Sequence, residues 1–84
     1  MNDQFECRKA WEEMFKYTIV IEKADGNYSA YCPDLPGCIA TGASVEETTE
    51  RIKEAIEFHI EGLKAEGLDV PLPATTAALV EVAL

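Results

Sequence analysis

Apolar and polar residues alternate with a period of two in the first half of the chain, which predicts β-strands. The segment 17–22, YTIVIE, alternates in this way and is rich in β-branched residues. Asp25-Gly26 follows, a dipeptide that tolerates the backbone of a tight hairpin, and 28–32 alternates again. We therefore expect a hairpin of two antiparallel strands.

A proline-rich segment then interrupts the alternation. Two prolines remove backbone donors and fix φ, and glycine adopts angles that other residues avoid. We interpret the segment as a rigid structural turn before a third short strand at 38–41, which Gly42 ends. The residues of this turn are Pro33, Asp34, Leu35, Pro36, Gly37 and Cys38.

The pattern changes to a helical period after residue 44. Ser44 and Glu47 have the spacing of a capping box. A single apolar stripe follows, and Gly67 stands where a left-handed residue commonly ends a helix. The stripe consists of Val45, Ile52, Ile56, Ile60 and Leu63. These signals predict a helix over 45–66, about 33 Å long at 1.5 Å per residue.

The two ends of the chain carry weaker patterns. Residues 3–15 place Cys7, Trp11, Met14 and Phe15 on one side of a short amphipathic helix. After the stiff Pro71-Leu72-Pro73 link, the alternation in 78–84 predicts a fourth strand. The expected organisation is an N-terminal amphipathic helix in 1–16 and one domain in 17–84.

These elements give an α+β fold of the order β-β-β-α-β. Sequential strands with short turns form an antiparallel meander, and the long helix covers one sheet face. The helix makes a right-handed crossover if the last strand is parallel to its neighbour. The other sheet face would carry Thr18, Val20 and Tyr31, which is not clearly polar. We expect the N-terminal helix or a second copy to cover it, which favours a dimer or a larger homo-oligomer.

Composition and charge limit the classes of function that fit this sequence. The chain has 84 residues, is 48% apolar and carries a net charge of −9, which fits one globular domain and disfavours direct nucleic-acid binding. A basic protein would be attracted, although acidity also serves solubility alone. No apolar run approaches the ~20 residues of a membrane helix. The first residues, MNDQ, lack the features of a signal peptide, so we expect a cytoplasmic protein.

Most of the acidic charge of the predicted helix falls on one face, opposite the apolar stripe. The residues of this face, here called the glutamate ridge, are Glu46, Glu50, Glu54, Glu57 and Glu61. Their mutual repulsion costs a few tenths of a kcal/mol per pair, on the order of 0.3. The ridge is either a solvated face or a docking surface for a cationic partner. Phe58 lies beside it, as an ordinary exposed aromatic or as an interface anchor.

The residues that carry chemistry do not form a recognisable catalytic or metal-binding motif. Cys7, Cys32 and Cys38 are odd in number and widely spaced, which favours small buried hydrophobes over disulfides or zinc ligands. His59 lies on the apolar stripe, where we expect a packed histidine with a local hydrogen-bond partner. We predict no enzyme, no metal and no cofactor.

The segment 17–73 resembles the HicB-like antitoxin family. The similarity lies in YTIVIEKADGNYSAY, in PDLPGC (33–38) followed by ATG, and in SVEETTERIKEAIEFHIEGLKAEG. The resemblance implies a partial RNase-H-like fold with the strand order 3-2-1-4. It also implies a partner, a HicA-type toxin: a small basic mRNA-cleaving ribonuclease with a double-stranded-RNA-binding-domain fold, which a HicB protein neutralises by covering its active face.

Two departures qualify the resemblance. Many HicB proteins continue into a DNA-binding domain, whereas this sequence stops at Leu84, so we do not expect it to bind an operator by itself. RNase H needs a metal-binding acid on its first strand, and YTIVI has none.

Three hypotheses follow. The first is an antitoxin that binds a HicA-like basic toxin through the glutamate ridge and the strand edges. The alternative is a stand-alone homo-oligomeric scaffold without a toxin. A small hydrolase that uses Cys38 or His59 is the third.

Overall fold

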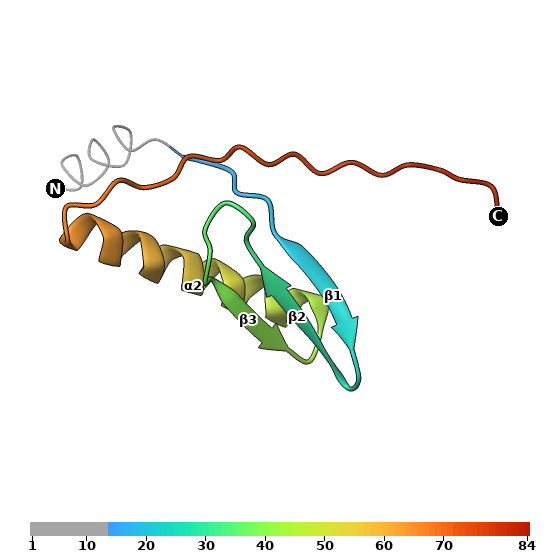
Figure 1. Cartoon of the computed structure of the whole chain (residues 1–84). Coiled ribbons are helices and arrows are strands. Elements are labelled where there is room, and N and C mark those ends of the chain that lie inside the picture. The colour runs from blue at the N-terminus through green and yellow to red at the C-terminus, as the bar shows by residue number, and fades with distance from the viewer. Residues whose placement is uncertain (1–13) are drawn as a thin grey trace, which may run out of the picture.

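A computed structural model describes residues 14–84 and contains three strands followed by one long helix (Figure 1). Strands β1 (Val20–Ala24), β2 (Asn27–Tyr31) and β3 (Ile39–Gly42) form an antiparallel sheet in the order β1-β2-β3. Helix α2 (Val45–Ala65) covers one face of this sheet and packs mainly over β3 and β2. The predicted α+β meander with one long helix on one sheet face is confirmed.

The hairpin between β1 and β2 turns at Asp25-Gly26. Ala24 pairs with Asn27, which leaves two residues in the loop. Gly26 has φ +80°, in the left-handed region that glycine adopts without a Cβ penalty. The register continues through Ile21↔Ala30 and Ala30↔Ala40, so every second residue of the sheet faces α2.

The core lies between α2, the sheet and the turn at 33–38. Its buried apolar members are Ala30, Cys32, Leu35, Cys38 and Ile52. Leu35 is wholly buried although it belongs to a turn. The Leu35 N–H donates to the Cys32 carbonyl at 3.1 Å and the Cys38 N–H donates to the Leu35 carbonyl at 3.2 Å. These bonds satisfy the backbone of the turn while its leucine fills the core.

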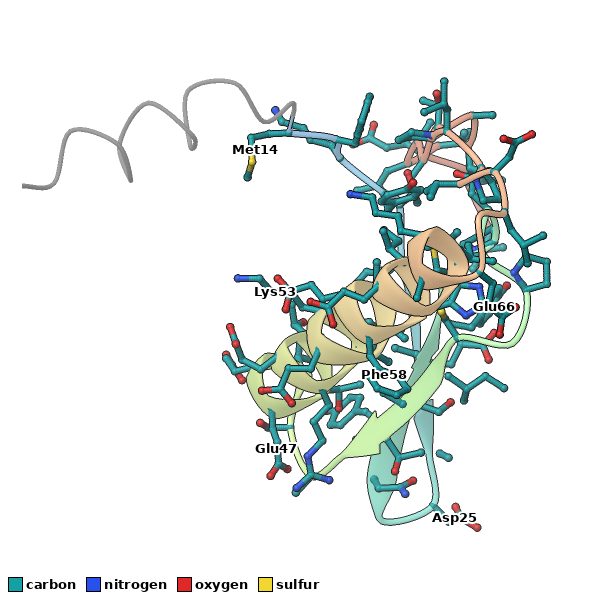
Figure 2. The ribbon with its side chains drawn as sticks, turned by 90° about the vertical axis from the view of Figure 1, so that its left-hand side faces the viewer. Met14, Asp25, Glu47, Lys53, Phe58 and Glu66 are labelled. Carbon is teal, nitrogen blue, oxygen red and sulfur yellow. The ribbon has the colours of Figure 1, made fainter. Side chains whose placement is uncertain are left out.

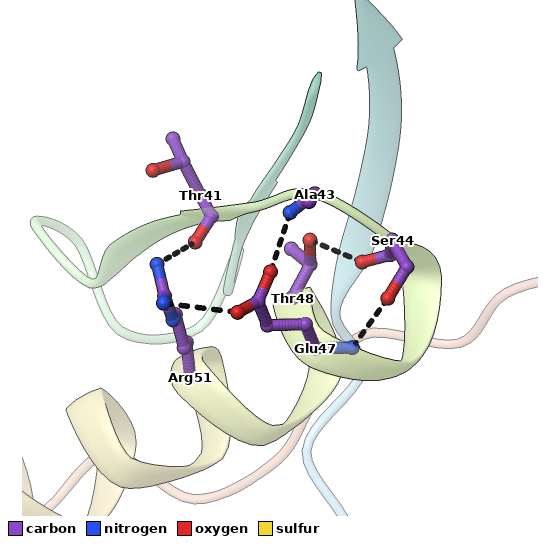
Figure 3. Close-up of polar contacts among 6 residues, drawn as sticks. All are labelled: Thr41, Ala43, Ser44, Glu47, Thr48 and Arg51. Atoms are coloured by element: carbon purple, nitrogen blue, oxygen red, sulfur yellow. Dashed lines mark hydrogen bonds and ion pairs between the residues drawn. The ribbon is translucent and has the colours of Figure 1, made fainter. Parts of the chain in front are cut away.

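Side-chain hydrogen bonds define the start of α2 (Figure 3). Ser44 Oγ accepts from the Glu47 N–H at 3.1 Å, and the Glu47 carboxylate accepts from the Ala43 N–H at 2.6 Å. In the usual capping box the glutamate reaches the N-cap residue itself, whereas here it reaches the residue before. Arg51 pairs with Glu47 at 3.0 Å and donates to the Thr41 carbonyl at 3.2 Å, which ties the helix to β3.

The end of α2 is a Schellman motif. The Leu68 N–H donates to the Leu63 carbonyl at 2.9 Å and the Gly67 N–H donates to the Lys64 carbonyl at 3.1 Å. Gly67 has φ +73°, as this motif requires. The helix therefore ends one residue before the predicted limit of 66. Among residues 14–84, no helix is both long and apolar enough to cross a membrane.

The predicted fourth strand beside the first is not found. Residues 78–84 are extended but belong to no strand, and Figure 1 shows them leaving the domain instead of following β1. The alternation was a correct sign of extended backbone. A strand also requires an edge for its N–H and C=O groups, and the path of the preceding residues turns the chain away from β1.

The ends of the other predicted elements shift slightly. β1 begins at Val20 instead of 17, and the side-chain hydroxyls of Tyr17 and Thr18 donate to the C-terminal part of the chain. The N-terminal helix lies outside the described residues, apart from Met14 and Phe15, which are not helical.

Candidate partner-binding surface

The glutamate ridge lies on the solvent face of α2. All five of its members are exposed. The opposite face of the same helix is fixed against the sheet by Thr48 and Ile52, both buried. With 100° between successive residues, burial of one face directs the glutamates to solvent. The ridge is therefore a consequence of how α2 packs.

The ridge glutamates form no ion pair within the described residues. The one ion pair among residues 14–84 joins Arg51 to Glu47, and Glu47 is not a ridge member because its carboxylate caps the helix. From Glu46 to Glu61 the ridge runs over 15 residue steps, about 22 Å. It is a long acidic row, and the exposed Lys53 and Lys64 lie on one flank of it without forming an ion pair among the described residues.

Phe58 adds an apolar group beside the ridge. Its side chain is 79% exposed, and Figure 2 shows it on a different side of α2 from Lys53. A hollow of about 410 Å³ lies on the Phe58 side, between α2 and the start of β3. Its lining includes Gly37, Cys38, Ile39, Phe58 and His59. An exposed aromatic next to a hollow and a charged row has the composition of an interface anchor with a polar rim.

The turn residues divide into buried, exposed and linking members. Leu35 and Cys38 are buried, and Pro33, Pro36 and Gly37 are exposed. Gly37 has φ +93°, which explains the glycine. Cys38 and Gly37 also contribute to the hollow beside Phe58, so the turn shapes one wall of the candidate surface.

Asp34 has a function in the fold that the sequence did not reveal. Its carboxylate accepts from the Ala74 N–H at 3.1 Å, the Thr75 N–H at 3.2 Å and the Thr75 hydroxyl at 2.9 Å. The Ala74 hydrogen bond lowers the pKa of Asp34 most, burial opposes it, and the Thr75 bonds lower it further. No local pattern reveals this contact, because its partners lie 40 and 41 residues away.

Cys38 and His59 lie at the same hollow without the features of a catalytic pair. Cys38 is buried, and its Sγ lies 3.9 Å from the Ala55 carbonyl as a weak donor. Burial raises the pKa of the Cys38 thiol, and nearby Cys32 raises it further, which works against a thiolate nucleophile. The His59 imidazole forms no hydrogen bond with another described residue, so the local partner expected from the sequence is not found there.

Metal ligands are equally sparse. No group of three or more His, Cys, Asp or Glu side chains in the described part of the chain is placed to hold a metal ion. Cys32 and Cys38 are buried free cysteines, so they lie in the core as small apolar residues.

Comparison with known proteins identifies several relatives by sequence. The UPF0150 protein ssr1765 of Synechocystis is 46% identical over 61 residues, which cover 71% of this chain and 77% of the relative. A UPF0150 protein of Archaeoglobus fulgidus is 51% identical over 47 residues, covering 55% and 68%. A 14.9 kDa protein from the rep-hol intergenic region of Haemophilus phage HP1 is 42% identical, and the match spans only 41% of its length.

A solved structure extends the similarity to three dimensions. It is a chain of a HicA3 and HicB3 toxin-antitoxin complex, with a TM-score of 0.62 and 33% sequence identity, covering 71% of this chain and 70% of the other. The family model for the HicB-like antitoxin of bacterial toxin-antitoxin systems matches residues 17–83. Because that match includes nearly the whole described chain, this protein belongs to the HicB-like antitoxin family.

Proposed function

We propose that this protein is an antitoxin that binds and neutralises a small basic HicA-type mRNA-cleaving toxin. The observation that carries the proposal is the exposed glutamate ridge, which has no basic partner among residues 14–84. The likeness to a chain of the HicA3 and HicB3 complex supports a toxin as the partner. The proposed action is binding, without catalysis by this chain.

Electrostatics gives the ridge its part in recognition. A chain of net charge −9 attracts a basic protein and repels RNA, and aligned charges raise the rate of encounter in a salt-dependent way. Rim charges alone supply modest affinity. Phe58, which borders the hollow beside β3, is the proposed anchor that slows dissociation once the toxin has docked.

The direct test is a titration of this chain with the small basic protein encoded next to its gene. Binding is measured by calorimetry at low and high salt, and neutralisation is measured as loss of RNA cleavage by that toxin. We expect a complex at low salt whose affinity falls as salt rises. Absence of a complex at low salt contradicts the proposal.

Variants that remove acidic charges test whether the ridge is the docking surface. In the ridge variant, Glu50→Gln, Glu54→Gln, Glu57→Gln and Glu61→Gln are combined, which removes four charges without shortening the side chains. The control removes four exposed acidic charges elsewhere, at Glu22, Asp25, Asp69 and Glu81. We expect the ridge variant to bind roughly 10- to 100-fold more weakly and the control to lose far less. Equal losses would assign the effect to net charge and exclude the ridge as the docking surface.

Phe58→Ala tests the anchor separately. Because Phe58 is exposed, its removal leaves the fold intact while faster dissociation of the toxin is expected. Leu68→Ala, another exposed apolar truncation away from the hollow, is the control. An unchanged dissociation rate for Phe58→Ala excludes it as the anchor.

A stand-alone homo-oligomeric scaffold is the second candidate. The observation that favours it is the apolar C-terminal part of the chain, which is exposed in the single molecule. A chain that self-associates but binds no basic neighbour, at any salt concentration, supports this candidate over the first.

A further inference from the structure

The last nine residues form an apolar segment that the single chain leaves in solvent. This C-terminal tail, residues 76–84, reads TAALVEVAL and contains one charged side chain. Val80 and Val82 are 80% and 72% exposed, and Leu79 and Leu84 are fully exposed. Soluble proteins rarely leave a contiguous apolar segment of this kind uncovered. Its alternation gives it one face of Val80, Val82 and Leu84.

A groove on the β1 side of α2 is also apolar and therefore complements the tail. It measures about 510 Å³ and is bounded by α2 and by the segments before β1 and after α2. Met14 and Lys53, which line it, are labelled in Figure 2. Its apolar lining includes Phe15, Ile19, Ile52, Ile56, Ile60 and Leu72. We call it the β1-side groove.

The groove is lined in part by the segment that leads into β1, and the outer edge of β1 is open. In the order β1-β2-β3, β1 pairs with β2 on one side, and no strand among the described residues pairs with its other side. An open edge presents unpaired N–H and C=O groups that favour the addition of a strand. The edge and the groove together offer backbone partners and an apolar surface to one extended segment.

The tail does not follow β1 in its own chain because the residues before it are held beside the segment that precedes β1. The Thr18 hydroxyl donates to the Thr75 carbonyl at 2.8 Å, and Tyr17 donates to the Pro71 carbonyl at 2.5 Å. Asp34 also accepts hydrogen bonds from the Ala74 and Thr75 N–H groups. From there the tail runs away from β1 and leaves the domain (Figure 1).

We propose that two copies of this chain exchange their tails. Each tail pairs as a strand with the β1 edge of the other copy and places Val80, Val82 and Leu84 in its β1-side groove. Residues 78–84 span about 23 Å at 3.3 Å per residue, enough to cover a five-residue strand of about 17 Å. Glu81 then faces away from the groove. Exchange of an identical segment is a low-cost route to a dimer, and it is independent of toxin binding.

The oligomeric state of tail variants tests the exchange. By analytical ultracentrifugation of the full chain, we expect a dimer at micromolar concentration. Val80→Asp combined with Val82→Asp should weaken it at least tenfold, because both charges would enter the apolar groove. Leu79→Asp with Ala83→Asp adds the same charge to the other face of the tail and should retain the dimer. A monomeric wild-type chain, or equal effects of the two variants, overturns the proposal.

A mixed-label NMR experiment tests whether each tail lies in the groove of the other molecule. Equal amounts of ¹³C-labelled and unlabelled chain are combined, and contacts between differently labelled molecules are selected. We expect contacts from the Val80 and Val82 methyl groups to Ile52 and Ile56 of the other molecule. If these contacts arise only within one molecule, or if another segment fills the groove, exchange is wrong. Both experiments omit the toxin, so their failure would leave the proposed antitoxin function unaffected.

Discussion

Single residues determine where this small domain tolerates change, and Gly42 is the clearest case. A Cβ at this position would lie 2.6 Å from Thr48 Oγ1 and 2.9 Å from the Thr48 backbone nitrogen. Thr48 is wholly buried and its hydroxyl donates to the Ser44 carbonyl at 2.7 Å. The first turn of α2 therefore approaches the end of β3 too closely for any side chain at residue 42.

We expect Gly42→Ala to destabilise the protein by about 1–3 kcal/mol, the usual cost of overpacking. The measurement is urea denaturation followed by circular dichroism. Gly62→Ala is the control, because its added Cβ would meet nothing within 4 Å and alanine favours a helix by roughly 1 kcal/mol over glycine. Opposite signs for the two substitutions are expected, and a destabilised Gly62→Ala with a neutral Gly42→Ala would contradict the close approach.

The hydrogen bonds that Asp34 accepts from the C-terminal part of the chain predict that this contact depends on pH. Hydrogen bonds from Ala74 and Thr75 lower the pKa of Asp34 from an ordinary value of 3.8. The folded pKa is depressed, so the stabilisation is present above 3.8 and is lost as the pH falls below that value through the folded pKa. In an NMR titration, the Ala74 and Thr75 amide shifts should change in this acidic range. Asp34→Asn should abolish that titration step, and its persistence would assign the step to another carboxylate.

The elements differ in how much of them the sequence could predict. The hairpin turn and α2 depend on local signals, Asp25-Gly26 in one case and Ser44, Glu47 and Gly67 in the other, so the turn and the helix were predicted to within one residue. The first strand lies two to three residues later than its alternation indicated. The fourth strand failed because alternation specifies extended backbone but not the edge it joins. Asp34 was assigned only to its turn, since a contact across 40 residues leaves no local pattern.

The candidate surface was predictable to the same extent. Helical periodicity alone places the five glutamates on one face, and all five are exposed. The hollow beside Phe58 was not predictable, because it forms between α2 and the turn before β3, which are separated in the sequence. The role of the glutamate ridge and of the hollow in binding a partner stays a prediction.

The N-cap of α2 gives a prediction for an element as a whole. Ser44→Ala removes the acceptor of the Glu47 N–H, which typically costs about 1 kcal/mol. Ser44→Asp supplies another acceptor near the positive end of the helix dipole and should retain most of the stability. Urea midpoints of the two variants provide the comparison. Equal losses would mean that the Glu47 bond to Ala43 and its pair with Arg51 fix the helix start without Ser44.

At the scale of the whole molecule, the two proposed surfaces occupy different sides of α2. The glutamate ridge faces solvent and Phe58 borders the hollow beside β3, whereas the β1-side groove lies on the other flank of the helix. Glu57 alone belongs both to the ridge and to the lining of the groove. A toxin can therefore bind one surface while a second copy binds the other, and separate variants test the two interfaces.

This separation predicts the composition of the complete assembly. Native mass spectrometry of the chain mixed with its toxin should give a complex of two copies of each protein. The Val80→Asp and Val82→Asp variant should give one copy of each, because the tail is altered while the ridge is intact. The ridge variant should give the dimer without toxin. If the tail variant lost the toxin as well, the two surfaces would be coupled, and the toxin would then require both copies to complete its binding site.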